Sequence, residues 1–390
     1  MIREALWVEI DRDAARWARM SDRIFDRPEL GREERFASAL LTEELERLGF
    51  AVERGVGGIE TAFRAVWENG AGGPALGLLC EYDALRGMGH GCAHHMQGPA
   101  VLAAAAALKS CPPAASFRLV VYGTPDEEYG NGKLTMLRNG CFAELDVALM
   151  THGGPNTTVD VKSMAERIYD ARFYGQAAHA AIRPEDGRSA LDALLLAFQG
   201  TEFLREHVPD DVRMHYTMRE AGAAVNVVPA FAAGTFVLRS YSAACLARVC
   251  ARFEDVVRGA ALMTGTRSEL ELVTCSENKI PVLTLNELLM EHARALGAPQ
   301  ISPPREKTGS TDFGAVMHRS PGSCIRVAFV PEGTSSHSQA FLDAGKSEAL
   351  HGALLLAAKV LAATVADLAE KPQLLEAIRR EFRDRLAEET

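Results

Sequence analysis

Short apolar segments that alternate with helical patterns constrain the fold of this chain more than any other feature. The segments at 75–80 (ALGLLC), 117–124 (FRLVVYGT) and 145–152 (LDVALMTH) are mostly apolar, as strands are in a sheet covered on both faces. Helical patterns are expected between them, over about 95–108 and 133–138. This alternation predicts an α/β fold with a doubly wound mixed sheet.

Between about residues 165 and 279 the pattern changes. Strand, helix, strand, strand, helix and strand follow one another, an order typical of a small antiparallel α+β layer of the ferredoxin-like type. After it the chain returns to a long helical pattern over about 346–368. We therefore expect residues 165–279 to form a domain inserted into a larger one, made of residues 1–164 and 280–390. A single domain with one core usually has about 100–150 residues. A chain of 390 residues is longer than this, which also indicates two domains.

Charge and composition exclude several classes of function. The net charge is −10 and runs of Lys or Arg are absent, so we expect no nucleic-acid partner. The first residues, MIREALWVEIDRDAARW, interrupt apolar positions with charges and do not resemble a signal peptide. Runs such as VLAAAAAL are too short to cross a membrane, and a cytoplasmic location is expected. The eight cysteines lack the spacing of a disulfide framework, and most are expected to be buried thiols.

Polar clusters follow the apolar strands. The segment at 81–83 (EYD) comes directly after the first, and 125–128 (PDEE) follows the second. His152 ends the third, and His337 lies beyond a further apolar run, IRVAFV. In open α/β sheets, ligands bind outside the carboxyl ends of the strands, so these residues can meet at one edge.

The segment GHGCAHH at 89–95 carries one thiol and three imidazoles. Cys92 and His94 are separated by one residue, which lets two donors address one binuclear centre from a turn. Thiolate and imidazole suit zinc or a similar metal. Taken alone, the segment is as compatible with a surface histidine cluster or a buried thiol as it is with a metal site.

The adjacent glutamates at 127 and 128 can have different roles. One can bind metal while the other acts as a general base towards a metal-bound water. A charged loop is the alternative, and His152 or His337 alone is compatible with an ordinary polar residue. The metal hypothesis therefore rests on the set of four clusters. Asp83 is suited to accept a hydrogen bond from a ligating imidazole.

Two other mechanisms can be weighed on the same residues. A Cys92 nucleophile with a histidine partner would leave both glutamates, His152 and His337 unused. A dinucleotide-dependent enzyme is disfavoured because no G-x-G-x-x-G segment follows the early strands.

The motifs also resemble those of a known family. From PELG at 28–31 to the final helix, the chain is similar to the zinc carboxypeptidase and aminoacylase-like amidohydrolases, in the branch of aminobenzoyl-glutamate hydrolase, hippurate hydrolase and auxin-conjugate amidohydrolase. Six segments carry the resemblance: EYDALRGMGHGCAHHMQG, GTPDEEYGNGKLTMLRNGCF, YGQAAHAAIRPEDGRSALDAL, GAAVNVVP, GSTDF and HSQAF.

The resemblance implies two divalent metal ions per chain, zinc or manganese, and an inserted domain that serves for dimerisation and as a lid. In this branch a cysteine bridges the metals, which matches Cys92. The resemblance then implies as further ligands His94, Glu128, His152 and His337. It also implies Glu127 as the base and His179 as the lid histidine that polarises the scissile carbonyl, often across a dimer. Asn226 and Arg239 match positions near the substrate carboxylate.

The sequence departs from the family pattern at two positions. Arg86 stands where the proline of DALPG is expected, and His95 where an Asn or Asp usually follows. A cation and an imidazole there could select an acidic or aromatic substrate, so Arg86 is a candidate substrate contact.

The activity that the resemblance implies is hydrolysis of the amide C–N bond of an N-acyl or N-aroyl amino acid or related small carboxylate. Alternatives are a dipeptidase, or an aminohydrolase that removes the amino group of an aminobenzoate such as nitroanthranilate. From another class, the chain could be a non-catalytic binding protein on a decayed hydrolase fold. A homodimer is the expected assembly.

Overall fold

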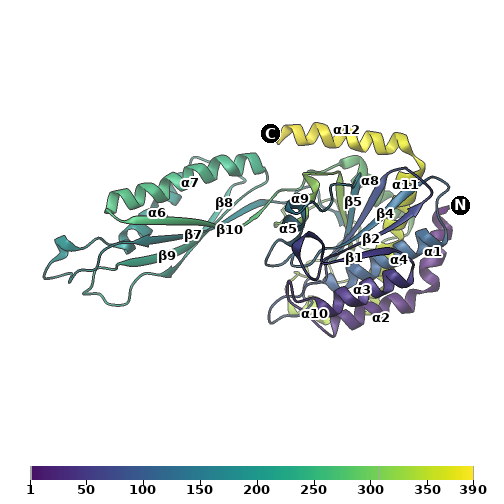
Figure 1. The fold of residues 1–390 in the computed structure, drawn as a ribbon, viewed down its shortest axis with the longest axis horizontal. Coiled ribbons are helices and arrows are strands. Elements are labelled where there is room, and N and C mark those ends of the chain that lie inside the picture. Colours follow the sequence, from purple (N-terminus) through teal and green to yellow (C-terminus); the bar gives the residue numbers. More distant parts are fainter. Residues whose placement is uncertain (1, 306, 390) are drawn as a thin grey trace. The chain divides into compact units, whose positions relative to one another are not determined.

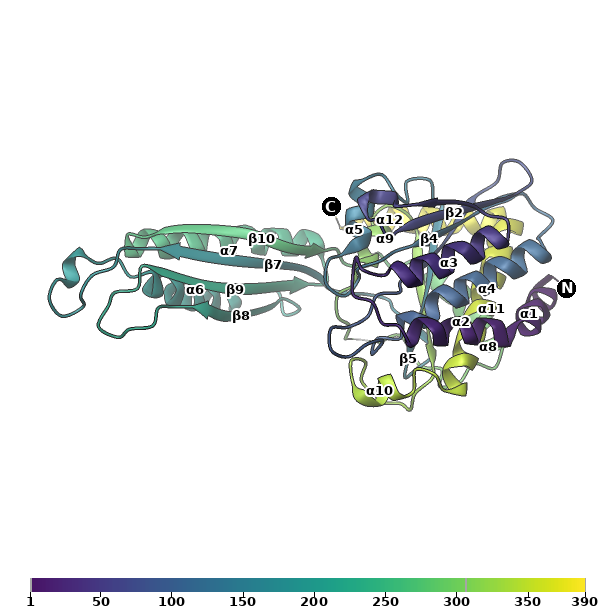
Figure 2. The same cartoon turned by 60° about the horizontal axis from the view of Figure 1, so that its bottom comes forward.

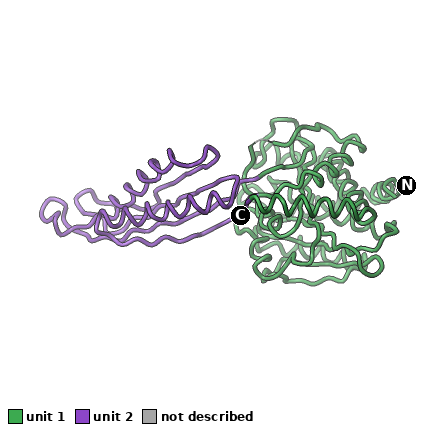
Figure 3. The backbone as a smooth tube through the Cα atoms, turned by 90° about the horizontal axis from the view of Figure 1, so that it is seen from above, with its two compact units in different colours: residues 1–162, 279–388 green, residues 163–278, 389–390 purple. Residues whose placement is uncertain are grey.

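The computed structural model describes residues 2–305 and 307–389. These form two compact units (Figure 3). The main unit extends to Lys162 and resumes over Lys279–Glu388, and the inserted unit comprises Ser163–Asn278 and Glu389. The junctions lie within two residues of the boundaries expected from the sequence.

The main unit is built on a seven-stranded mixed sheet with the strand order β1-β2-β4-β3-β5-β11-β6. Neighbours among β3, β4, β5 and β11 are parallel, whereas β1, β2 and β6 pair antiparallel with their neighbours. The strands are β1 (Ala51–Arg54), β2 (Phe63–Asn69), β3 (Ala75–Cys80), β4 (Phe117–Gly123), β5 (Val147–Gly154), β6 (Thr158–Val159) and β11 (Gly322–Ala328). The predicted α/β class with a mixed sheet is confirmed.

The register of the parallel strands brings their carboxyl ends together. Cys80, the last residue of β3, pairs with Gly123, the last residue of β4. In β5, His152 pairs with Arg326 of β11. All residues of β3 and β5 are buried, as their apolar composition indicates. The segments that leave these strands therefore begin at one edge of the sheet.

Helices pack against this sheet. In the main unit they are α1 (Ile2–Arg12), α2 (Ala14–Phe25), α3 (Arg35–Arg47), α4 (Gln97–Ser110), α5 (Gly132–Arg138), α8 (Leu283–Ala295), α9 (Phe313–Met317), α10 (Gln339–Asp343), α11 (Glu348–Glu370) and α12 (Pro372–Glu388). Helices α2 and α3 lie beside α4 (Figures 1 and 2). The alanine-rich α4 contacts α11, because small side chains allow close approach of the two helices.

Helix α11 corresponds to the helix expected over about 346–368, and by length and composition alone it could cross a membrane, contrary to the expectation that the apolar runs are too short. Most of it is buried in the main unit against α4, α8, β5 and β11. The core of the protein therefore accounts for its apolar character. It ends at Glu370, and Pro372 starts α12, since proline is favoured at the first position of a helix.

The inserted unit is a four-stranded antiparallel sheet with the order β10-β7-β9-β8. Its elements are β7 (Ala165–Tyr174), α6 (Ala190–Arg205), β8 (Arg213–Glu220), β9 (Phe231–Ser240), α7 (Ala243–Thr264) and β10 (Arg267–Ser276). Buried and half-buried residues alternate along β9, as in a sheet whose two faces differ. This is the α+β order that the sequence predicts for the insertion.

Candidate metal centre

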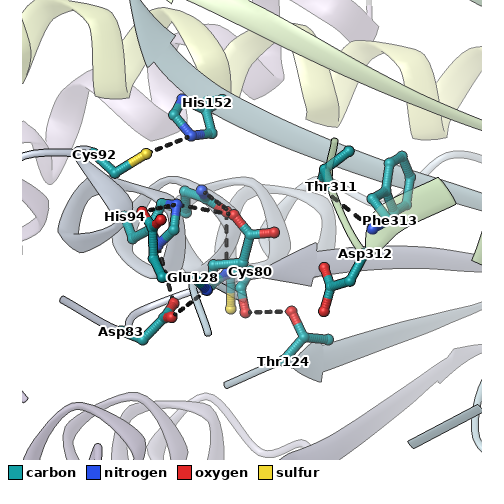
Figure 4. Close-up of polar contacts among 12 residues, drawn as sticks. Cys80, Asp83, Cys92, His94, Thr124, Glu128, His152, Thr311, Asp312 and Phe313 are labelled. Atoms are coloured by element: carbon teal, nitrogen blue, oxygen red, sulfur yellow. Dashed lines mark hydrogen bonds and ion pairs between the residues drawn. The ribbon is translucent and has the colours of Figure 1, made fainter. Parts of the chain in front are cut away.

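Four chain segments meet at the carboxyl edge of the main sheet. Figure 4 shows Cys92, His94, Glu128 and His152 from three of them. Cys92 and His94 precede α4, Glu128 follows β4, His152 lies in β5, and His337 lies between β11 and α10. Their donor atoms form three overlapping groups, and within each group all atoms lie within 4.8 Å of one another. The groups are Cys92 with His94 and His152, Cys92 with Glu128 and His337, and His94 with Glu127 and Glu128.

Cys92 belongs to two of these groups. Its Sγ atom lies 3.6 Å from Nε2 of His152 and 3.3 Å from Nε2 of His337. His337 Nε2 is in turn 3.5 Å from Oε1 of Glu128, and His94 Nε2 is 3.9 Å from the same oxygen. One sulfur atom between two sets of donors is the arrangement that a thiolate bridging two cations requires.

The backbone around the centre is held in an uncommon conformation. Ala93 has φ 62°, which places Cys92 and His94 on either side of a left-handed residue, and His337 has φ 60°. Positive φ is unfavourable for such residues and is concentrated at functional sites. The His337 N–H donates to the Gly91 carbonyl over 3.0 Å, which ties the His337 loop to the Cys92 turn.

The donor set fits a divalent metal. His94 Nε2 and Glu128 Oε1 are buried, and neither has a hydrogen-bond partner among the described residues. Leaving such an atom unsatisfied costs roughly 1–3 kcal/mol, a cost that a bound cation removes. Thiolate, imidazole and carboxylate donors together suit zinc or a metal of similar preference.

Neighbouring groups orient the imidazoles. His94 Nδ1 lies 3.0 Å from Oδ1 of Asp83, the contact that the sequence suggested for this aspartate, and Asp83 Oδ2 accepts the Glu128 N–H over 2.9 Å. His152 Nδ1 lies 2.7 Å from the Gly153 carbonyl. A proton on each Nδ1 leaves Nε2 as the free acceptor facing the centre.

Electrostatics favour the ionised ligands. Burial alone would raise the pKa of Cys92, but His94 and His152 outweigh it and lower this pKa to about 6. Burial likewise opposes ionisation of Glu128, yet His337 and His94 lower its pKa to about 2. The hydrogen bond with Cys92 and the neighbouring Glu128 carboxylate raise the pKa of His337 to about 10. A metal ion must therefore displace a proton from His337, and its affinity falls as the pH falls.

A cavity of about 230 Å³ opens onto this centre. Its lining includes Glu127, His152 and His337, together with Lys279, Arg305 and Arg326. The small volume suits the reacting part of a small molecule and excludes a folded protein segment.

A family model described as "Peptidase family M20/M25/M40" matches residues 77–367, which is most of the chain.

This chain belongs to the M20/M25/M40 peptidase family.

Curated relatives span nearly its whole length. Xaa-Arg dipeptidase from Mus musculus is 35% identical over 397 residues, covering 97% of this chain and 92% of the relative. One of the p-aminobenzoyl-glutamate hydrolase subunits of Escherichia coli is 31% identical, covering 95% of this chain and 93% of the relative. Among solved structures, the YXEP protein of Bacillus subtilis, described as a dinuclear metal binding peptidase of the M20 family, shares the fold with a TM-score of 0.72. It is 17% identical and covers 92% of this chain and 99% of its own.

Family membership confirms the predicted resemblance and class of activity. The chain is a hydrolase of the amidohydrolase and metallopeptidase type, and divalent metal is implied by the family. The predicted ligand roles of individual residues rest on the geometry above and are taken up as a proposal below.

Sequence reasoning missed a buried ion cluster beside the candidate metal centre. Lys133 Nζ lies 2.5 Å from Oε1 of Glu81 and 2.6 Å from Oδ1 of Asp312. Gln97 donates to the other Glu81 oxygen over 2.8 Å. All four side chains are buried. Glu81 directly follows strand β3, so a carboxylate at the end of a buried strand was the available signal for it, whereas Asp312 in GSTDF directly precedes helix α9.

Glu127 connects this cluster to the metal centre. Its carboxylate lies within 4.8 Å of donor atoms of Glu81 and Asp312 on one side, and of His94 and Glu128 on the other. Burial and the neighbouring carboxylates of Glu81 and Asp312 raise the pKa of Glu127 well above its ordinary value. A carboxylate with a raised pKa is suited to accept and return a proton near neutral pH.

The two departures from the family pattern lie in different environments. The Arg86 side chain is exposed and is not among the residues that line the cavity. The backbone N–H of Arg86 donates to the Tyr129 hydroxyl over 3.1 Å. His95 is fully buried, with Nε2 2.7 Å from the Gly345 carbonyl and its ring against Phe25. His95 therefore packs in the core and does not face a substrate.

The remaining candidates lie in the inserted unit. His179 and Asn226 are exposed and adjacent, since the Ala180 N–H donates to the Asn226 carbonyl over 2.9 Å. Arg239 pairs with Glu166, which stands opposite it at the start of β7. His179 follows the other end of β7, so roughly 26 Å of strand separates Glu166 from Tyr174 at about 3.3 Å per residue. His179 and Arg239 therefore belong to opposite ends of this unit.

Proposed function

We propose that this protein is a dinuclear amidohydrolase that cleaves the amide bond of an N-acyl or N-aroyl amino acid. In this proposal two divalent ions are held by Cys92, His94, Glu128, His152 and His337, with Cys92 shared. The observation that carries the proposal is the position of the Cys92 sulfur in two groups of closely spaced donors. The thiolate favours zinc over manganese.

The ions would supply Lewis acidity and lower the pKa of a water from 15.7 to about 7. Glu127 accepts the proton from the attacking water and delivers it to the nitrogen of the leaving group. Its raised pKa and its place between the metal donors and the buried cluster support this role. Asp83 holds His94 in the orientation that the proposed ligand set needs.

His179 is the proposed donor to the oxygen of the scissile carbonyl. An exposed imidazole in the inserted unit is available to a second chain, so we propose a homodimer in which His179 acts on the partner's site, with Asn226 beside it. Arg239 is proposed as a contact for the substrate carboxylate, the role that the family resemblance implies for this position, and Glu166 is its ion-pair partner within the inserted unit. Arg86 is left out because it does not line the cavity.

A dipeptide is the second candidate substrate. The 35% identity to an Xaa-Arg dipeptidase over nearly the whole chain favours a peptide bond. The same site would cleave either bond, because both are secondary amides with a carboxylate on the amine side. A cytoplasmic location remains part of the proposal.

A substrate screen tests the proposal. Zinc- or manganese-loaded protein is incubated with N-acyl amino acids, p-aminobenzoyl-glutamate, Xaa-Arg dipeptides and aminobenzoates, and release of amino acid and of ammonia is measured. We expect metal-dependent release of amino acid and about two ions per chain by elemental analysis. Ammonia from aminobenzoates without amino acid from amides, or a folded active protein free of metal, contradicts the proposal.

A further inference from the structure

The chain that follows the PELG segment at 28–31 contacts the loop of the proposed base, although none of its residues takes part in the proposed reaction. Oε1 of Glu34 accepts the Asp126 N–H over 2.9 Å, and Nε of Arg32 lies 2.8 Å from Oδ2 of Asp126. Asp126 directly precedes Glu127. A segment 92 positions away in the chain therefore holds the start of this loop.

Asp126 has an uncommon backbone conformation. Its φ is 64°, which is unfavourable for a residue other than glycine and persists only where the surroundings enforce it. Its carbonyl accepts the Gly132 N–H over 2.9 Å. Its carboxylate packs against Gly31 and Gly130, where an added side-chain carbon would overlap with it. Every polar group of Asp126 is thus engaged, and its N–H is engaged by Glu34.

The Glu34 side chain does not cap its own helix. Glu34 occupies the N-cap position of α3, but its side chain makes no capping hydrogen bond. Glu29 accepts the N–H groups of Phe36 and Ala37 instead, over 2.9 and 3.0 Å. The second oxygen of Glu34 accepts the Thr61 hydroxyl over 2.8 Å. Helix capping therefore does not account for Glu34.

Glu34 is fully buried, and burial raises its pKa to about 7. A buried polar group lowers stability unless its hydrogen bonds are made, and an ionised one lowers it further. An apolar side chain at this position would avoid that cost. The hydrogen bonds to Asp126 and Thr61 are therefore the contacts that account for an acid here.

The loop of the proposed base is held on both sides of Glu127. Glu34 accepts the N–H of Asp126 on one side, and Oδ2 of Asp83 accepts the N–H of Glu128 over 2.9 Å on the other. If the contact at Asp126 were lost, Glu128 would still be anchored by Asp83. The side chain that would then change its direction is that of Glu127.

We propose that Glu34 is a positioning residue, which holds Asp126 in its left-handed conformation and thereby orients the Glu127 carboxylate towards the attacking water. This inference rests on the proposed function, because it assigns the support of the base in that reaction. Glu34 does not line the cavity, so its effect should fall on kcat and not on KM. A misplacement of a reacting group by about 1 Å can lower the rate about 10²-fold.

The first test uses three substitutions in the zinc-loaded enzyme, with the amide that the substrate screen finds most active. Glu34→Met removes the acceptor of the Asp126 N–H and should lower kcat roughly 10–100-fold, with KM within about twofold and the metal content unchanged. Glu34→Gln keeps an oxygen for this N–H and should restore most of kcat. Thr61→Val is the matched control, because it removes the other hydrogen bond of Glu34 and should leave kcat unchanged.

A second pair of variants perturbs the same contact without changing Glu34. The added carbon of Gly31→Ala would overlap with the Asp126 carboxylate, so this variant should lower kcat in the same way as Glu34→Met. Gly352→Ala is its control, because nothing lies within 4 Å of the carbon added there in α11. Thermal unfolding verifies that each variant is folded. Gly31→Ala decides the question if Glu34→Met does not fold.

Hydrogen exchange separates failure of this inference from failure of the proposed function, because it needs no turnover. The amides of residues 126–132 should exchange at least about tenfold faster in Glu34→Met than in the wild type, and at the wild-type rate in Thr61→Val. Unchanged exchange, wild-type kcat or loss of metal in Glu34→Met overturns the positioning role while amide hydrolysis stands. An equal loss of kcat in Thr61→Val also overturns it. Absence of amide hydrolysis in the wild type overturns the proposed function, and exchange then decides the loop contact alone.

Discussion

The two units of this chain use sheets of different kinds, and their polar residues differ accordingly. The main unit has parallel strands buried on both faces, and it buries charged groups such as Glu81, Lys133 and Asp160 at and near the carboxyl edge. The inserted unit has an antiparallel sheet, and its candidate functional residues His179 and Asn226 are exposed. Buried charges interact strongly and are screened little, whereas exposed ones are hydrated and screened by salt.

The difference teaches where function and stability are coupled. In the main unit a substitution in a buried ion cluster should change both the folded state and the chemistry. In the inserted unit, a substitution at an exposed residue should change either the stability of the folded state or the chemistry, but not both. All three tryptophans, Trp7, Trp17 and Trp67, belong to the main unit, so tryptophan fluorescence reports the unfolding of that unit alone.

Of the substitutions considered, Glu127→Gln should have the largest effect on activity. A small effect would contradict the comparison between the two units. Loss of the proton acceptor should lower kcat by up to about 10⁴-fold. Elemental analysis should still find about two ions per chain, since the proposed ligands are unchanged. Turnover near the wild-type rate would refute the role of the main unit as the sole source of the base.

Lys133→Met tests whether a buried charge in the main unit holds its fold. Removing one partner of a buried pair costs roughly 3–5 kcal/mol, because the carboxylates of Glu81 and Asp312 lose their counter-ion. Urea titration followed by tryptophan fluorescence measures the change. Lys346→Met is the control, since Lys346 pairs with Asp26 at the surface and should change stability by at most about 1 kcal/mol. Equal effects of the two variants would contradict the comparison.

His179→Ala tests whether an exposed residue of the inserted unit contributes to activity without contributing to stability. Loss of one carbonyl-polarising donor should lower kcat by roughly 10²–10³-fold. The urea midpoint should not move, because His179 is exposed. If the histidine serves the partner's site, mixing this variant with Glu127→Gln under conditions of subunit exchange should restore part of the activity. No restoration in mixtures shown to exchange subunits would place His179 in its own chain's site.

Glu34→Gln sharpens the comparison through pH. Burial raises the pKa of Glu34 to about 7, although its carboxylate accepts hydrogen bonds from Thr61 and the Asp126 N–H. The folded state therefore favours the protonated acid, and the free energy of unfolding should fall as the pH rises from about 4.5 to 7. The loss relative to Glu34→Gln is on the order of 3 kcal/mol. Urea titrations of both proteins at pH 5 and pH 8 measure it, and a constant difference would contradict the prediction.

Ser189→Ala should have the smallest effect. The Ser189 hydroxyl accepts the Asp192 N–H over 3.1 Å and caps helix α6 of the inserted unit. Its loss should cost about 1 kcal/mol of stability within that unit. Hydrogen exchange should accelerate in α6, while the tryptophan-detected unfolding of the main unit stays unchanged. Faster exchange in α4 as well would show that the two units unfold together.

Much of the architecture could be predicted from local patterns. The apolar run at 75–80 is strand β3, and the pattern expected at 95–108 is helix α4, which begins at Gln97. Helices α1 and α2 were not singled out, because charges interrupt their apolar residues. The separate helix α12 was also missed, although Pro372 marks its start.

The site was predicted unevenly. The five proposed ligands lie in motifs with metal-binding residue types, and the fold brings them together. Lys133 gave no signal, because a lysine at the start of a short helix is usually exposed. Its partners Glu81 and Asp312 are 52 and 179 positions away in the chain.

The sequence by itself determined the order of strands and helices, the two-unit organisation and the residue types that can hold a metal, because periodicity and turn residues act over a few neighbouring positions. Only the tertiary structure decided which charges are buried together. Asp160 meets Lys279, Arg305 and Arg326 across 119, 145 and 166 positions. Burial and charge compensation depend on which residues pack together in space. The spacing of residues along the chain does not determine these contacts.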